Sequence, residues 1–230
     1  MTAQSISIRR VERFDIPEGR TPILKNGLAV GAIENTRQTL TVEGVIFKKY
    51  VGKYNQTFQE DIWVFDSLSD DLLEINQYQK AFEFNIFYSV DKRILFSDTT
   101  TPITKKFLHN LEGMAGVEVD YSALRLDFLS ISDMMPQTRG VRFNSDDQGV
   151  NSKSFSGDEV DSNNEASEAL ENDHATQIVG NLDILGLSRT IMLTQSGTLL
   201  VYTPLNDLNN REYPMLEFAL ATLRTIRILD

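Results

Sequence analysis

The sequence contains no cysteine, only two histidines, and no apolar run of the length, about 18 residues, that a membrane-spanning helix needs. The missing cysteine excludes a disulfide framework and a thiol nucleophile. The first residues also lack the apolar stretch of a secretory signal. We therefore expect a cytoplasmic protein in a reducing compartment, with no membrane partner.

The motifs that bind nucleotide phosphates are missing as well. There is no P-loop and no G-x-G-x-x-G, and Gly44 and Gly52-Lys53 have the wrong spacing for a phosphate cradle. No serine stands in a G-x-S-x-G motif. His109 and His174 are predicted to be solvated surface residues. P-loop hydrolysis and Rossmann hydride transfer are therefore not expected, and no cofactor is predicted.

Two candidate cation sites lack some of the ligands that the ion requires. His109 and Glu112 would share one face of a helix, but a zinc site needs a third protein ligand. A calcium loop beginning at Asp161 would have Ala166 where the sharp turn needs glycine, and Asn172 where a bidentate glutamate is needed. We therefore predict no metal site from these residues.

The charge of the chain is unevenly distributed. Acidic residues exceed basic ones by 33 to 22, yet residues 1–60 carry a net charge of +3. Residues 61–135 and 136–230 each carry −7, and the segment 144–173 holds nine acids and one base, Lys153. Such asymmetry is typical of chains whose parts meet different partners, although an acidic run is also commonly a solvated, disordered loop.

Hydrophobic periodicity predicts an α+β fold in four parts. Residues 1–66 are predicted to be a β-rich basic part, and residues 67–135 an α+β part. Residues 136–175 are predicted to form an acidic, flexible loop with one short strand candidate, Gly140–Phe143, and a short acidic helix over Glu165–Asp173. Residues 176–230 are expected to supply a β-hairpin and an apolar helix that pack on the rest of the molecule.

Individual elements follow from local signals. Residues 37–51 are predicted to be one long strand with Gly44 as a bulge or bend, followed by a polar loop over 53–60. Ser69 is expected to cap a helix. The clearest helix covers residues 101–112, with Pro102 at its first position, and flanking strands make it the centre of a strand–helix–strand unit.

The C-terminal helix is expected from Pro214 to about Ile228, after a hairpin whose turn contains Gly197. Apolar side chains cover most of the circumference of this helix, which predicts burial in its own core or against another subunit. Core burial is the default interpretation. The candidate residues for contact with a partner are Phe218, Leu223 and Ile226.

A basic aromatic segment, which we interpret as the hairpin Phe47–Phe58, is the candidate for nucleic-acid binding. In such sites aromatic rings stack on bases while lysines neutralise phosphates. The same residues also suit a buried core and a protected sheet edge. The candidate contact residues are Phe47, Lys48, Lys49, Tyr50, Lys53 and Tyr54.

Paired carboxylates are the candidate for catalysis. Glu118 and Asp120 are predicted on one side of a strand, with Asp127 on the next segment. Two or three such groups can hold the magnesium ions of a nuclease or phosphodiesterase. However, no D/E-x-K tripeptide occurs in the chain. The alternative is that these acids only solvate strand ends.

Together these features favour a non-enzymatic intracellular binding or regulatory protein, a subunit of a larger protein or nucleoprotein complex. Its partner is expected to be another protein or a second copy of the chain. The first alternative is a nucleic-acid-binding protein acting through Phe47–Phe58. The second is a metal-dependent nuclease or phosphodiesterase that uses Glu118 and Asp120 with Mg²⁺.

Overall fold

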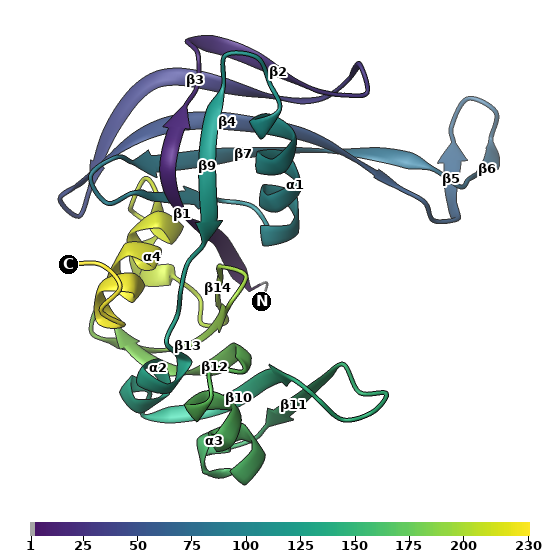
Figure 1. Ribbon diagram of the computed structural model, residues 1–230. Coiled ribbons are helices and arrows are strands. Elements are labelled where there is room, and N and C mark those ends of the chain that lie inside the picture. The colour runs from purple at the N-terminus through teal and green to yellow at the C-terminus, as the bar shows by residue number, and fades with distance from the viewer. Residues whose placement is uncertain (1–2) are drawn as a thin grey trace.

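Strands dominate the chain, with 50% of residues in strands and 20% in helices. The computed structural model describes residues 3–230 (Figure 1). The strands are β1 (Gln4–Asp15), β2 (Gly19–Lys25), β3 (Leu28–Val42), β4 (Val45–Phe58), β5 (Ile62–Asp66), β6 (Asp71–Ile75), β7 (Tyr78–Ser89), β8 (Ile94–Ser97), β9 (Glu118–Ala123), β10 (Gln137–Asn144), β11 (Ser152–Ser156), β12 (Ala175–Ile184), β13 (Leu187–Thr194) and β14 (Thr198–Val201). The helices are α1 (Thr101–Glu112), α2 (Phe128–Met134), α3 (Asn164–Glu171) and α4 (Pro214–Thr225), with the short 3₁₀ turns η1 (Val160–Ser162) and η2 (Asn206–Leu208).

Twelve of these strands form one sheet. Its order is β11-β10-β12-β13-β14-β1-β8-β7-β4-β3-β2, and β9 pairs with β1 beside this path. Strands from all four predicted parts of the chain join it. The predicted α+β class is therefore wrong, because the fold is mainly antiparallel β-structure and the helices only cover its faces.

β1 connects the two halves of the sheet. It pairs antiparallel with β14 over residues 4–7, with β8 over residues 7–10, and with β9 over residues 9–15. Because β8 and β9 both pair with β1, the helix between them completes the predicted strand–helix–strand unit. β1 thus places the N-terminal and C-terminal strands in a single sheet.

Residues 3–66 contain only strands among their regular elements, which agrees with the predicted β-rich part, but the strand boundaries differ from the prediction. The predicted strand 37–51 is interrupted at Glu43 and Gly44, which have φ angles of 49° and 77°. These positive angles suit a two-residue hairpin turn, so the chain reverses there from β3 to β4. The predicted loop 53–60 is mostly strand as well, because β4 continues to Phe58 in register with β7.

The helix predicted after Ser69 does not form. Residues 71–75 are instead β6, which pairs residue by residue with β5 around a four-residue turn. Apolar side chains next to a helix-capping residue favoured the helix locally, whereas cross-strand pairing with residues 62–66 decided the structure.

Elements with strong terminal signals were predicted correctly. α1 has Pro in its first turn, and α4 likewise starts at Pro214. The hairpin predicted around Gly197 forms as β13–β14, and the strand from Phe82 with its returning strand over residues 93–97, which the period-2 pattern also indicates, forms as β7–β8. Gly197 has a φ of 81°, and a Cβ at this position would collide with the carbonyl oxygen of Ile8. Both the positive φ and the lack of space for a Cβ therefore require glycine at this position of the β13–β14 turn.

Residues 136–175, predicted to be a flexible acidic loop, contain β10, β11, η1 and α3 in the structure. Seven apolar residues of this segment are buried in the larger core cluster, and four of them come from η1 and α3: Val160, Ala166, Ala169 and Leu170. The acids lie on the opposite, solvated side, so the high charge does not prevent an amphipathic helix from packing.

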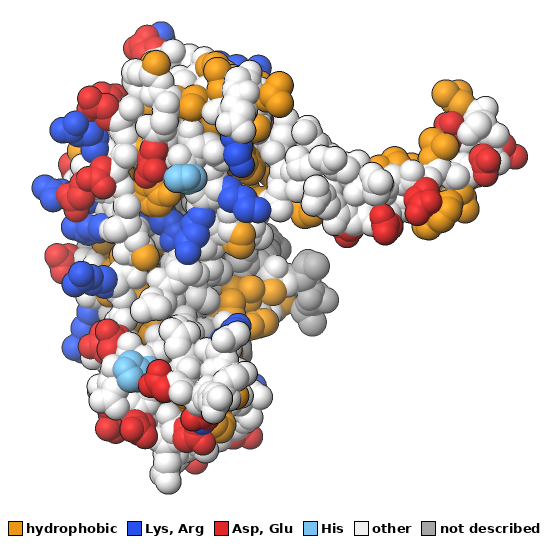
Figure 2. Space-filling view, turned by 45° about the vertical axis from the view of Figure 1, so that its right-hand side comes forward, with side chains coloured by type: hydrophobic (Ala, Val, Ile, Leu, Met, Phe, Trp, Pro, Cys, Tyr) orange, Lys and Arg blue, Asp and Glu red, His pale blue; other side chains and the backbone are white. Residues whose placement is uncertain are grey.

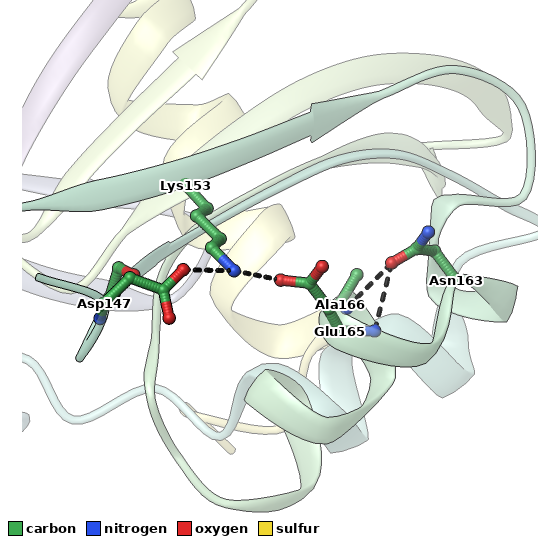
Figure 3. A network of polar contacts seen from close by, with 6 residues as sticks. Asp147, Lys153, Asn163, Glu165 and Ala166 are labelled. Atoms are coloured by element: carbon green, nitrogen blue, oxygen red, sulfur yellow. Dashed lines mark hydrogen bonds and ion pairs between the residues drawn. The ribbon is translucent and has the colours of Figure 1, made fainter. Parts of the chain in front are cut away.

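A polar network also holds this acidic segment together (Figure 3). Lys153 of β11 forms ion pairs with Asp147, at 2.9 Å, and with Glu165 of α3. Asn163 caps α3 by accepting hydrogen bonds from the backbone N–H groups of Glu165 and Ala166. The β10–β11 connection and α3 are thereby joined through one lysine.

The two faces of the N-terminal strands contribute to different hydrophobic clusters. α1 covers one face with Ile103, Phe107 and Leu111, above Leu95 of β8. The neighbouring Ile94 and Phe96 point the other way, into the larger cluster with α4 and the C-terminal strands. This alternation is the expected period-2 pattern of a strand that is buried on both faces.

Candidate functional site

The basic aromatic segment places its rings and its lysines differently. Phe47, Tyr50 and Tyr54 are buried in the core, and Tyr50 packs edge-on against Phe14 with ring centroids 5.1 Å apart. Buried rings are not available for stacking on bases. The predicted hairpin is also a single strand, because Phe47–Phe58 lies entirely within β4.

The lysines of this strand lie towards solvent, and two of them have partners within the chain. Lys53 forms an ion pair with Glu83 at 2.8 Å. The Lys49 Nζ lies 5.3 Å from the centroid of the Tyr213 ring. Lys48 is exposed. The structure therefore does not bring the predicted lysines and rings together on one surface.

The structure keeps two of the predicted catalytic carboxylates, Glu118 and Asp120, in one shallow pocket, which Asp127 does not line. Glu118 and Asp120 lie on β9, where Glu118 is exposed and forms an ion pair with Arg13 at 2.8 Å. Asp127 caps α2, and hydrogen bonds from the hydroxyl and backbone N–H of Ser130 lower the pKa of its carboxyl. Within residues 3–230, no three His, Asp or Glu side chains are grouped to hold a metal ion.

The candidate partner residues of α4 and its C-terminal end are buried. Phe218, Leu223 and Ile226 are at most 4% exposed and belong to the larger core cluster. This burial agrees with the default interpretation, in which the apolar helix packs in the core of its own chain. A surface for a partner must therefore be sought elsewhere on the molecule.

The most distinctive surface feature is an arm that projects from the sheet (Figure 1). β3 pairs with β4 only as far as Tyr54, and beyond it, among the described residues, β4 and β7 pair only with each other. Phe58 and Tyr78 close this two-stranded ribbon with stacked rings 5.3 Å apart. The arm, defined as residues 55–81, ends in the separate hairpin β5–β6, which we call the arm tip (residues 62–75).

The arm tip exposes a concentration of large apolar side chains. Trp63 is 63% exposed, Phe65 59% and Leu68, at the apex of the turn, 96%. Phe65 pairs with Leu72 and therefore shares a face with it and with Trp63, while Val64 and Leu73 occupy the opposite face. Both faces of the hairpin are thus apolar and open to solvent, an arrangement that an isolated two-stranded hairpin tolerates poorly in water.

Hydrogen bonds shape the turn of the arm tip. The Asp66 carboxylate accepts from the backbone N–H of Leu68 at 3.0 Å and from the hydroxyl of Ser69 at 2.8 Å. These two bonds lower the pKa of Asp66. The backbone N–H of Asp70 also donates to the carbonyl of Asp66 at 2.9 Å. Leu68 is therefore held outward by a formed turn.

The arm tip is acidic as well as apolar. Residues 60–75 contain six acids and no lysine or arginine, and the one base of the arm is Lys80 near its root. Figure 2 shows orange and red side chains along the outer part of the arm, while the blue side chains gather on the body. A surface that binds the tip should therefore combine apolar contacts with positive charge.

Sequence reasoning missed the arm although part of its signal was visible. Residues 61–66 read as a strand apolar on both faces, a pattern typical of a fully buried strand. This strand lies at the end of a long ribbon because β3 stops pairing with β4 at Tyr54. The sequence of residues 61–66 carries no information about where that pairing ends. The absence of any lysine or arginine over residues 60–75 was the second available signal.

No protein-family model matches the sequence, and no curated protein matches it either. Among the helices of residues 3–230, none has the length and apolar character needed to cross a membrane. The geometry of the arm is therefore the strongest guide to function that the molecule offers.

Proposed function

We propose that this protein is a non-catalytic binding protein, a subunit of a larger assembly, which docks on its partner through the arm tip. The observation that carries this proposal is the exposure of Trp63, Phe65, Leu68 and Leu72 on a projecting hairpin that has no core of its own. Exposed apolar patches of this kind mark interaction sites.

The energetics suit an anchoring role. Full burial of a Leu or Phe side chain contributes about 1.5–3 kcal/mol, and tryptophan is enriched among the residues that dominate binding energy. Trp63, Phe65 and Leu68 together can thus supply a compact anchor. The hydrogen-bonded turn at Asp66 reduces the conformational entropy lost on binding, because Leu68 is already held in place.

The expected partner is a protein with an apolar groove bordered by basic side chains. The six acids of residues 60–75 favour such a border, and they disfavour an acidic surface such as a nucleic-acid backbone. Over the part of the chain that the structure describes, both outer edges of β5–β6 are unpaired, so a strand of the partner can also add to the hairpin.

Site-specific photo-crosslinking tests the proposal. A photoreactive amino acid replaces Trp63 in the cells that naturally make the protein, and a matched variant carries it in place of Leu187. Leu187 is 49% exposed and lies on β13, in the body of the molecule. We expect one discrete protein adduct from position 63 and none from position 187. Absence of an adduct at 63, or equal labelling from both positions, would overturn the proposal.

A further inference from the structure

A cleft on the body of the molecule has the chemistry that the arm tip requires. It has a volume of about 1010 Å³. Its walls come from β1, α1, β9 and the segment that follows it, from the α3–β12 connection and the β13–β14 turn, and from the C-terminal end of the chain. This volume lies at the upper end of small-ligand pockets, which leaves room for large side chains of a protein partner.

The cleft is basic. Arg10, Lys105 and Arg125 line it, against the single acid Asp173. Within residues 3–230, neither Lys105 nor Arg125 has a carboxylate within 4.0 Å, and Arg10 reaches only Glu12, at 3.9 Å. The described part of the chain therefore presents two unpaired cations here.

A buried arginine lies behind one wall of the cleft. Arg9 is 1% exposed, and its Nη1 donates to the carbonyl oxygen of Ser196, a residue that lines the cleft. Within residues 3–230, the Nε and Nη2 atoms of Arg9 have no hydrogen-bond partner, and no carboxylate forms an ion pair with it. A buried cation without a counter-charge is costly, so negative charge in the neighbouring cleft stabilises it.

Apolar side chains lie beside these cations. The half-buried Ile228 lines the same cleft, and Leu124 and Leu126, which are 6% and 8% exposed, also reach it. The combination of apolar wall and positive charge is the complement of the arm tip, which combines apolar side chains with acids.

We infer that the partner of the arm is a second copy of this chain, and that the arm tip of one copy docks in the basic cleft of the next. This inference rests on the proposed function of the arm. The arm extends away from its own body, so the contact joins different copies (Figure 1). Because arm and cleft are different surfaces, the association is head-to-tail and gives a closed ring or an open filament.

Two complementary variants test the inference. The arm variant, Phe65→Ser with Leu68→Ser, retains the cleft, and the cleft variant, Lys105→Glu with Arg125→Glu, retains the arm. Sedimentation is measured for wild type, for each variant alone, and for their equimolar mixture. We expect wild type to form oligomers and each variant to be monomeric. The mixture should form a dimer that grows no further, because only one intact arm and one intact cleft can meet.

A neighbouring lysine supplies the matched control. Lys106→Glu changes an exposed neighbour of Lys105 that does not line the cleft, and it should leave the oligomers intact. Circular dichroism confirms that each variant is folded. The inference is overturned if wild type is monomeric at every concentration, or if wild type associates while the mixture does not form the dimer. A photo-crosslink from position 63 to a different protein refutes the inference but leaves the proposed function standing.

Discussion

Tyr50 illustrates how the environment of one residue separates two interpretations of the same sequence. Its position between lysines suits a stacking platform for bases, yet its ring is 2% exposed and lies in the cluster beneath α1. Burial, with added repulsion from Tyr88 and Asp15, raises the pKa of Tyr50 to about 12. The hydroxyl of Tyr50 is thus held in its neutral form in the folded protein.

Alkaline pH is therefore expected to destabilise the fold through Tyr50. In the unfolded chain this tyrosine ionises near pH 10, so the unfolded state loses its proton first and stability falls as the pH rises from about 10 to 12. The lost free energy of unfolding should be about 2 kcal/mol. Tyr50→Phe keeps the ring and removes this contribution. Denaturant unfolding at pH 8 and pH 11.5 measures the effect, and equal pH dependence in both proteins would contradict it.

Arg189 is a second buried arginine, and unlike Arg9 it forms an ion pair with a carboxylate among the described residues. It is 1% exposed, its Nη2 donates to Asp207 at 2.6 Å, and its guanidinium lies 5.6 Å from the ring centroid of Phe218. The bond from Arg189 lowers the pKa of Asp207. The pair fastens the segment between β14 and α4 onto β13.

Asp207→Ala should destabilise the protein by about 2 kcal/mol, because it leaves the Arg189 cation buried without a carboxylate. This value is below the about 3–5 kcal/mol typical of a fully buried pair, since the Asp207 side chain is 35% exposed. A lowered pKa means that the stabilisation is present above about pH 4 and is lost as the pH falls below that. Thermal unfolding at pH 7 and pH 3 measures both effects. A variant that is as stable as wild type at pH 7 would refute a stabilising role for this pair.

At the level of secondary-structure elements, the acidic segment shows how few apolar residues suffice to order a charged helix. α3 places three residues in the core, and Lys153 connects it to the turn before β11. Hydrogen bonds to Glu165 and then Asp147 raise the pKa of Lys153, so this cation stays charged over the whole neutral range. The sequence signal for disorder, a high acid content, did not account for this arrangement.

Lys153→Met should loosen this region without unfolding the molecule. Removing the cation leaves Asp147 and Glu165 unpaired at the surface, so amides of α3 and of residues 145–151 should exchange faster, whereas those of β12 should not change. Hydrogen exchange detected by mass spectrometry measures this difference. Lys153→Arg serves as the control and should exchange like wild type. Unchanged protection of α3 in the Met variant would show that its apolar contacts alone order it.

The elements that the sequence predicts correctly are marked by residues within the element itself. α1 and α4 are each marked by a proline in the first turn, and the β13–β14 turn by Gly197. β6 has no such local mark and depends on pairing with β5. For the candidate site residues, the sequence shows which side chains could bind a ligand. Which of these side chains are buried depends on the packing of strands that are distant in sequence.

For the molecule as a whole, one strand decides the architecture. β1 pairs with β14, β8 and β9, and so fuses strands from both ends of the chain into one sheet. Contacts of this kind, between residues nearly 200 positions apart, leave no periodic signal in the sequence. The sequence pattern therefore predicted four separate parts, whereas strands from all four belong to one sheet.

The same architecture leaves the arm as the one long ribbon without sheet neighbours on either side in the part of the chain from residue 3 to residue 230. Its tip is apolar on both faces and acidic at its borders, while the body offers a basic cleft. We therefore expect a protein surface to cover the arm tip in the assembled state.

The fluorescence of Trp63 reports on this covering, because the chain contains a single tryptophan and it lies on the arm tip. Emission and acrylamide quenching are measured over a dilution series of the purified protein and in the complex isolated from the cells that make it. We predict blue-shifted, protected emission in the assembled state and red-shifted, quenchable emission after dilution to monomers. Emission that is equally red-shifted and quenchable in every sample, the isolated complex included, would contradict docking through the arm tip.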